Sequence, residues 1–204
     1  RSASHTRAII NLGGFCNVTY LPANCSVEAV HGCDVCCCNL LLNAIAKERL
    51  HTEYDINGQY ASKGEINDGF LGWLTGQLHL QQEAGRSLGT GDDLSQPTLE
   101  RGSQLTTNDL LATVVAAIGA TINEASQDVE EIYLAGGGAM NHALINSIKH
   151  DGTIESLGVP LQAREGMAMG ILGALTQDGV SITLPQVTGR QETTDVVGFI
   201  QASP

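Results

Sequence analysis

The stretch EIYLAGGGAMN, residues 131–141, decides the fold. It begins with a short run of β-forming residues, continues with three glycines and leads into a helical pattern from Asn141 to His150, so it predicts a buried strand, a tight turn and a helix. Backbone without side chains lets a flat base or a phosphate approach, and the next helix offers unpaired N–H groups. A purely structural turn would produce the same letters, because short glycine motifs also occur without a ligand.

A second glycine turn lies near the start of the chain. Residues 7–11 and 17–21 are two β-rich runs separated by Gly13-Gly14-Phe15-Cys16, the pattern of an antiparallel hairpin. A third strand is expected at residues 27–31, and a loop over residues 31–39. The two glycine turns are the places where we expect a ligand to approach the backbone.

The spacing of apolar residues predicts helices and leaves a long loop between them. Residues 83–103 are polar and glycine-rich, so a flexible surface loop is expected there. Strands that alternate with helices in the second half predict the α/β class, with a mixed or parallel sheet covered by helices. Helices are expected at residues 39–48, 70–78, 107–122 (after a capping box of Thr106 and Asp109) and 164–176, and short strands at residues 153–156 and 196–200.

Charge and composition exclude several classes of partner. The chain has 204 residues and a formal net charge of −12. Its basic residues form no stripe, which argues against a nucleic-acid partner. No apolar run approaches the ~20 residues needed to cross a bilayer, and the first residues lack the apolar segment of a signal peptide, so we expect a cytoplasmic protein with no membrane partner. Because the chain begins without Met, directly before a strand pattern, we expect a segment upstream of Arg1 to have been lost or to lie on another chain.

Six motifs occur in an order that resembles the anhydro-N-acetylmuramic acid kinases. The hairpin NLGGFCNVT, residues 11–19, looks like N-I-G-G-I-A-N-I-T of that family, and residues 136–141 fit its G-G-G-x-x-N. The other four matches are Gly32, Asp34 and Asn39 in a G-F-D-T-G-P-G-N loop, Tyr54 to Gly64 in Y-D-x-D-G-x-x-A-x-x-G, residues 157–168 in G-I-P-x-x-x-x-E-A-x-A-F, and residues 184–189 in L-P-S-V-T-G. The resemblance covers nearly the whole chain, and six ordered motifs are more specific than any one.

This resemblance implies the α/β fold of actin-like ATPases and sugar kinases, a ribonuclease H-like domain with a mixed sheet flanked by helices. It implies an enzyme that uses ATP and Mg²⁺, opens the 1,6-anhydro bond of an amino sugar and phosphorylates O6 in cell-wall recycling. In the family a carboxylate base and the first phosphate loop lie upstream, so residues 1–204 correspond to the C-terminal nucleotide-binding lobe and contain no catalytic residue. The implied partners are an anhydro sugar, whose identity the related levoglucosan kinases leave open, and an N-terminal lobe in cis or in trans. A homodimer is also left open, and the lone chain is not expected to be active.

The resemblance also assigns site residues. Nucleotide contacts are expected from Asn11, Gly13, Gly14, Asn17, Gly136, Gly137, Gly138 and Asn141. Asp34, Asn39, Asp55 and Glu165 are expected to contact the sugar or a water on Mg²⁺. Asp34 and Asp55 fit solvated turn residues equally well, and Glu165 fits an acid that complements the dipole of a helix N-terminus.

Two departures from the family keep other functions open. Val35-Cys36-Cys37-Cys38 stands where the family has T-G-P-G, and Thr90-Gly91 stands where K-S-T-G-R-E ends in an Arg and a Glu. The first replacement puts cysteine side chains where the family has glycines for close approach of the backbone. The second cannot form the charge-assisted hydrogen bonds of a guanidinium or a carboxylate. A catalytically decayed, pseudokinase-like module for nucleotide binding or assembly is therefore the alternative, and another member of the superfamily, such as an acetylglucosamine kinase or an activator ATPase, is the third hypothesis.

All six cysteines lie between Cys16 and Cys38. Cys33-x-x-Cys36 followed by two further cysteines admits a zinc or iron–sulfur site, but adjacent cysteines rarely all face one metal. Free thiols are the favoured interpretation, so no metal site is predicted from them. A thiol beside the N-terminus of the helix that begins near Asn39 is expected to have a lowered pKa.

Overall fold

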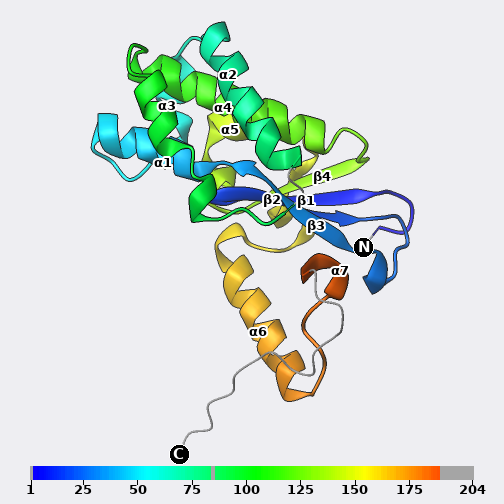
Figure 1. Cartoon of the computed structure of the whole chain (residues 1–204). Coiled ribbons are helices and arrows are strands. Elements are labelled where there is room, and N and C mark those ends of the chain that lie inside the picture. Colours follow the sequence, from blue (N-terminus) through cyan, green and yellow to red (C-terminus); the bar gives the residue numbers. More distant parts are fainter. Residues whose placement is uncertain (1, 84–85, 189–204) are drawn as a thin grey trace, which may run out of the picture.

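The computed structural model describes residues 2–83 and 86–188 (Figure 1). The strand expected at residues 196–200 lies outside them. In this part of the chain, no helix is both long enough and apolar enough to cross a membrane.

A mixed five-stranded sheet is the centre of the fold. Its order is β3-β2-β1-β4-β5, with β1 antiparallel to β2, β2 antiparallel to β3, and β4 parallel to both β1 and β5. The strands are β1 (Arg7–Leu12), β2 (Phe15–Leu21), β3 (His31–Cys37), β4 (Glu131–Ala135) and β5 (Gly152–Thr153). The predicted α/β class, with a mixed sheet flanked by helices, is confirmed.

Seven α-helices are found among the described residues. Their bounds are α1 (Asn39–Ile45, continued by a π-helical turn over Ala46–Leu50), α2 (Asp68–Glu83), α3 (Ser95–Arg101), α4 (Thr107–Ala125), α5 (His142–Ser147), α6 (Arg164–Gln177) and α7 (Pro185–Thr188). The capping prediction for α4 is confirmed, since the Asp109 N–H donates to Thr106 Oγ1 at 3.2 Å. Asp109 also accepts hydrogen bonds from the Glu65 N–H and the Thr106 hydroxyl, which lower the pKa of its carboxyl.

Helices α1 to α5 cover one face of the sheet and close the hydrophobic core there (Figure 1). Alternate residues of β1, namely Ala8, Ile10 and Leu12, point into this core and are at most 1% exposed. Helix α4 contributes its apolar stripe, including the fully buried Leu110 and Ile118. A sheet that is covered on one face buries every second residue of a strand, and the helix that covers it buries one apolar stripe. Both patterns are found here.

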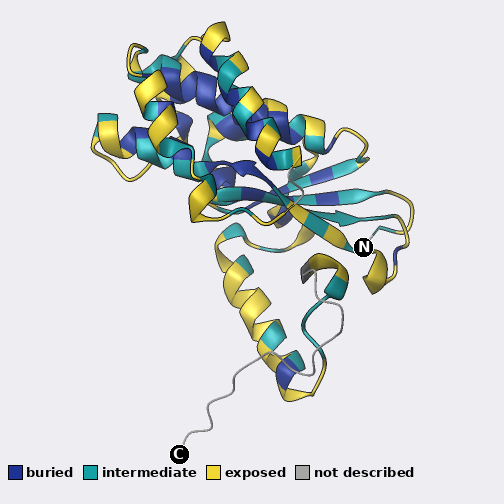
Figure 2. Cartoon of the chain, viewed as in Figure 1, coloured by how far each residue is buried: buried dark blue, intermediate teal, exposed yellow. Residues whose placement is uncertain are grey.

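The opposite face of the sheet has much less cover. The other residues of β1, such as Ile9 and Asn11, are only partly buried. Helix α6 extends away on this side of the sheet and is exposed along most of its length (Figure 2). The chain then returns to α7, where Gln186 Nε2 donates to the Val27 carbonyl at 2.9 Å.

The strand and loop expected at residues 27–39 were wrong. Val27–Ala29 is a 3-10 turn, and the expected loop is strand β3, which pairs with β2 through a register shift at Cys16/Asn17. The sequence of β3 lacks apolar alternation because Val35, Cys36 and Cys37 are all buried beyond that bulge. Because β3 lacks the alternation of apolar and polar residues that marks a strand, its sequence was mistaken for a loop.

Three other boundaries differ from the prediction. The loop expected over residues 83–103 contains helix α3, which the sequence hid because its residues are polar although Thr98 is fully buried. The helix expected to reach His150 ends at Ser147, and the strand expected at residues 153–156 is only Gly152–Thr153, followed by a 3-10 turn. Flexibility of the remaining loop is still a prediction.

Candidate functional site

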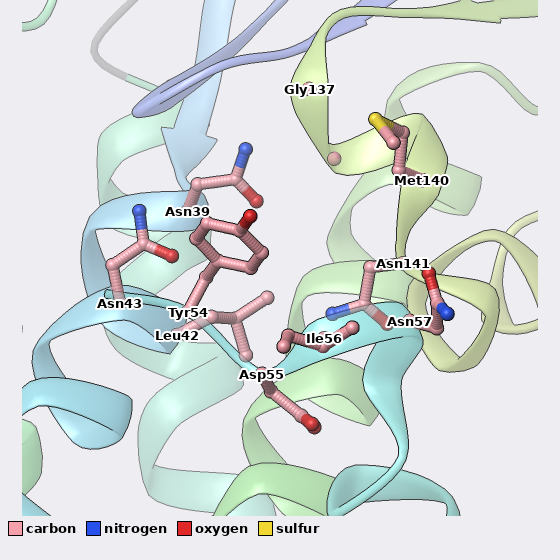
Figure 3. Close-up of a pocket in the computed structure, with 11 residues that line it drawn as sticks. Asn39, Leu42, Asn43, Tyr54, Asp55, Ile56, Asn57, Gly137, Met140 and Asn141 are labelled. Atoms are coloured by element: carbon pink, nitrogen blue, oxygen red, sulfur yellow. The ribbon is translucent and has the colours of Figure 1, made fainter. Parts of the chain in front are cut away.

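A pocket of about 380 Å³ lies between α1 and the turn that follows β4 (Figure 3). Four asparagines and four large apolar or aromatic residues line it, so hydrogen-bonding groups are interspersed with apolar surface. Its volume lies within the roughly 300–1,000 Å³ of small-molecule sites. The lining residues are Asn39, Leu42, Asn43, Tyr54, Asp55, Ile56, Asn57, Gly137, Gly138, Met140 and Asn141.

The three glycines of this turn have different surroundings. Gly136 has a φ of +83°, and a Cβ there would lie 2.5 Å from Asn11 Oδ1 and 2.9 Å from the Leu12 carbonyl oxygen. A Cβ on Gly138 would lie 2.7 Å from Leu12 Cβ and 3.1 Å from Asn39 Oδ1, whereas one on Gly137 would meet no atom within 4 Å. Gly136 and Gly138 thus allow the turn to pack on β1, and Gly137 faces the pocket.

The two glycine turns lie side by side. Leu12, which contacts the turn after β4, directly precedes Gly13 in the hairpin. Asn39 links the two turns, because its Nδ2 donates to the Leu12 carbonyl at 2.9 Å while its Oδ1 lies beside Gly138. The structure therefore brings together the two segments that the sequence singled out.

The helix that begins after β3 offers no free N-terminus to an anion. The Asn39 and Leu40 N–H groups donate to the carbonyls of Gly13 (3.0 Å) and Gly14 (3.2 Å). The helix after the GGG turn is capped as well, since the Leu144 N–H donates to Asn141 Oδ1 at 3.1 Å. Contacts to a phosphate at this site would therefore come from turn backbone and from amide side chains.

Asn11 has an unsatisfied group between the two glycine turns, although neither it nor Gly13, Gly14 and Asn17 line the pocket. Its Oδ1 is buried beside Gly136, and no group in the described part of the chain donates a hydrogen bond to it. Its Nδ2 lies 3.4 Å from the position of a Cβ on Gly13. A buried amide oxygen without a donor costs about 1–3 kcal/mol, so this position suits a ligand group or a metal-bound water that donates.

Three polar residues form a row across the less covered face of the sheet. Asn11 is opposite Asn17 in the β1–β2 pair, and Asn17 is opposite Asp34 in the β2–β3 pair. Asp34 Oδ2 accepts a hydrogen bond from the Leu88 N–H at 2.7 Å, which fastens the loop before α3 to the edge of the sheet. Asp34 is therefore neither a solvated turn residue nor part of the pocket lining.

Asp55 is buried and holds its own loop together. Its carboxylate accepts hydrogen bonds from the N–H groups of Tyr60 (3.0 Å) and Ala61 (2.9 Å), and only 5% of the residue is exposed. The next motif glycine, Gly58, has a φ of +69° and packs against Asn141. This loop thus forms one wall of the pocket, and a contact between Asp55 and a sugar or hydrated Mg²⁺ remains a prediction.

Glu165 lies in the first turn of α6 and is not one of the residues that line the pocket. Its side chain is 89% exposed and approaches the neighbouring Arg164 at 3.6 Å. The 3-10 turn Leu161–Ala163, directly before α6, contacts the GGG turn, but Glu165 itself does not line the pocket. Its contact with a sugar remains a prediction.

The loop that matches K-S-T-G-R-E keeps its one cation occupied. Arg86 Nη1 donates to Asp92 Oδ2 at 2.9 Å, and the Gly89 N–H donates to the same oxygen at 2.8 Å. The Arg86 guanidinium and the Gly89 N–H lower the pKa of Asp92 to about 2. This pair is exposed, so it organises the loop more than it stabilises the fold.

The cysteine cluster is part of the core. Cys16, Cys36, Cys37 and Cys38 are fully buried free thiols, and the described residues contain no group of three or more ligands that could hold a metal. Burial raises the pKa of Cys37 to about 11 and that of Cys38 to about 12, so the expected low pKa near the helix start was wrong. Desolvation of the thiolate outweighs the helix dipole here.

Sequence reasoning missed part of the pocket lining. Asn43 lies one helical turn after Asn39, so the four-residue spacing on α1 was a usable signal. Met140 lies within the GGG motif itself, and Tyr54 was noticed only as a motif letter. Leu42, Ile56 and Asn57 gave no signal, because nothing in the sequence says that their loop folds against the turn after β4.

Comparisons with known proteins agree with these motifs. The family model described as anhydro-N-acetylmuramic acid kinase matches residues 1–202. The anhydro-N-acetylmuramic acid kinase of Shewanella woodyi is 34% identical over 200 residues, which are 90% of this chain and 52% of the relative. That of Caldanaerobacter subterraneus is 28% identical over 209 residues, covering 93% of this chain and 53% of the relative.

Solved structures give weaker similarities. Component A of the Acidaminococcus fermentans (R)-2-hydroxyglutaryl-CoA dehydratase has a TM-score of 0.44 at 16% identity and covers 75% of this chain and 53% of its own. An activator of 2-hydroxyisocaproyl-CoA dehydratase from Clostridium difficile, with bound ADPNP, has a TM-score of 0.46 at 16% identity, covering 74% of this chain and 54% of its own.

The chain spans about half the length of the curated relatives it matches. The family model nevertheless extends over almost all of its residues, and the motifs that carry the match include both glycine turns. The chain belongs to the anhydro-N-acetylmuramic acid kinase family.

Proposed function

We propose that this chain is the nucleotide-binding half of an ATP-dependent kinase that hydrolyses the 1,6-anhydro bond of an anhydro amino sugar and phosphorylates the freed O6. The observation that carries the proposal is that the two family glycine turns lie side by side, joined through Asn39, and that the GGG turn lines a pocket. The proposal includes a role in cytoplasmic recycling of cell-wall amino sugars, which the family match supports. The substrate is an anhydro-N-acetylmuramic acid or a related anhydro sugar.

The pocket suits a nucleoside. Asn39, Asn43 and Asn141 offer amide donors and acceptors to the edges of a base, and Tyr54 and Met140 offer apolar surface to its faces. Gly137 leaves the backbone open at this wall, so a flat ring can lie against it. None of the described residues that line the pocket is a cation that would attract a phosphate, which supports a position of the phosphates outside it, towards the hairpin.

The hairpin end of the site suits the phosphates and their metal. Asn11 Oδ1 and the neighbouring Asn17 amide would hold a water of a hydrated Mg²⁺, which supplies charge neutralisation to a triphosphate when bound. The backbone of Gly13 and Gly14 would position the transferred phosphoryl group. The carboxylate base that activates water lies on the other lobe, so this chain's own task is to place ATP relative to it.

Nucleotide titration of the purified chain tests the proposal. Isothermal titration with MgATP is expected to show one site per chain, and a variant with a side chain at Gly137 is expected to lose it. Supply of the N-terminal lobe, in cis or in trans, is then expected to restore phosphorylation of an anhydro sugar. No MgATP binding by either the chain or the restored protein would refute the nucleotide site.

A decayed, pseudokinase-like module is the second candidate. It is favoured by the three core cysteines that replace T-G-P-G and by Thr90-Gly91, which replace an Arg and a Glu. The two candidates differ in turnover, since the decayed module would bind MgATP in the restored protein without acting on any anhydro sugar.

A further inference from the structure

Helix α6 is apolar on all sides and yet almost entirely exposed. Its sequence, REGMAMGILGALTQ, carries charges only at Arg164 and Glu165. A helix without a polar face is normally buried, because no side of it favours water. In this chain Met169 is 70% exposed, Ile171 is 59% exposed, and Thr176 is its only buried residue.

One side of α6 is bare backbone. Gly166, Gly170 and Gly173 follow a spacing of four and three residues, which places them along one stripe of the helix. A Cβ on any of them would meet no atom of residues 2–83 and 86–188 within 4 Å. Each glycine in a helix interior lowers stability by about 1 kcal/mol relative to alanine. Three glycines along one stripe are therefore expected where a second backbone packs closely against the helix, because a side chain there would hold it away.

The exposed surface extends beyond α6. Val180 and Val187, which follow the helix, are 46% and 44% exposed. Figures 1 and 2 place α6 on the side of the sheet that helices α1 to α5 leave uncovered, where the polar row of Asn11, Asn17 and Asp34 also lies. Apolar surface of this kind, next to a candidate ligand site, marks an interaction surface.

We propose that α6 and the open face of the sheet form the docking surface for the other lobe of the kinase, with a helix of that lobe crossing α6 at Gly166, Gly170 and Gly173. The relatives that match this chain over 90–97% of its length are about twice as long, so they contain a second portion of similar size. Helix α6 lies inside the matched residues and therefore belongs to the kinase architecture. The inference rests on the proposed two-lobe kinase and names the surface that joins the lobes.

A second copy of this chain is the competing occupant of the surface. Each copy carries a net charge of −12, so two copies would repel each other. The surface of α6 itself has almost no charge to offset that repulsion. A lobe of different composition has no such penalty.

Co-expression tests the proposal. The full 204-residue chain is co-expressed with the portion of the Shewanella woodyi kinase that lies outside the match, so that neither has to fold alone, and the product is examined by size-exclusion chromatography with light scattering. A 1:1 complex is expected. Gly170→Leu is expected to weaken it at least tenfold with unchanged circular dichroism, because a leucine fills the helix crossing and a Cβ there meets no described residue of the chain.

Gly72→Leu is the matched control, since Gly72 is also an exposed helical glycine with nothing within 4 Å of its Cβ position, but lies on α2. This variant is expected to form the complex as the parent does. Met169→Lys provides a second variant of α6 that keeps the glycines and is also expected to weaken the complex.

Three results would overturn the docking surface: no complex, a complex equally tight with Gly170→Leu and Met169→Lys, or a homodimer that these variants dissociate. MgATP titration of the lone chain separates this failure from failure of the proposed function. Intact nucleotide binding without a complex refutes only the docking surface, and a complex without nucleotide binding refutes only the nucleotide site.

Discussion

The two faces of the sheet differ in what they contain. The face under α1 to α5 has an alternation of fully buried apolar residues and forms a finished core, while the opposite face carries a polar row and an apolar helix with little cover (Figure 2). Burial of these apolar side chains within the chain itself stabilises the fold on the first face. The second face has little cover among the described residues, which is why we propose it as the docking surface of the other lobe.

Substitution of isoleucine on each face should give the largest contrast. Ile118→Ala in α4 removes a fully buried side chain and is expected to lower the free energy of unfolding by about 2–5 kcal/mol. Ile171→Ala in α6 removes a side chain that is 59% exposed and is expected to change it by less than about 0.5 kcal/mol. Urea denaturation of the lone chain measures both, and equal losses would show that α6 is already packed.

A side chain at Gly137 should separate binding from folding. Gly137→Val is expected to weaken MgATP binding by at least about 30-fold, or about 2 kcal/mol, because the methyl groups enter the pocket and meet no atom of the chain. Isothermal titration measures the affinity, and Gly76→Val on the exposed side of α2 is the control. Gly136→Val should instead unfold part of the protein, since its φ of +83° and contacts with β1 tolerate no side chain. Unchanged affinity in Gly137→Val would argue against the site.

The buried thiols should make stability depend on pH in the alkaline range. An unfolded cysteine ionises near pH 9, whereas folded Cys38 stays protonated until about pH 12. The unfolded state therefore loses its proton first, so stability is constant below pH 9 and falls as the pH rises from 9 towards 12. Between pH 8 and 10 the loss is expected to be roughly 1 kcal/mol per buried thiol. Chemical denaturation at several pH values measures it, and Cys38→Ala should flatten the slope.

The smallest effect is expected at Asn11. Asn11→Ala removes the oxygen that would hold a water on Mg²⁺, and MgATP affinity is expected to fall about fivefold, or about 1 kcal/mol, while affinity for metal-free ATP is unchanged. Stability should hardly fall, because the oxygen has no donor in the described part of the chain. Titrations with and without Mg²⁺ measure this, and the exposed Asn146→Ala on α5 is the control. An equal loss in both titrations would place Asn11 elsewhere than at the metal.

Local signals in the sequence determined the parts of the fold in which burial follows a regular period. The strand at residues 131–135, the hairpin and the capped α4 were predictable, because alternation, a glycine turn and a helical stripe each report a neighbour that covers one face. The two glycine turns and the family resemblance were also visible without a structure. Both depend on residues adjacent in the chain.

Tertiary contacts alone decided the rest. Strand β3 was hidden because a bulge buries three consecutive residues, and the cysteines have raised pKa values because the core surrounds them on all sides. The pocket needs Gly58, in the loop of Tyr54, to pack against Asn141, a contact between segments more than 80 residues apart in the sequence. The exposure of α6 could not be predicted either. An apolar sequence predicts that a helix is buried, but it does not show which part of the protein, or which other molecule, buries it.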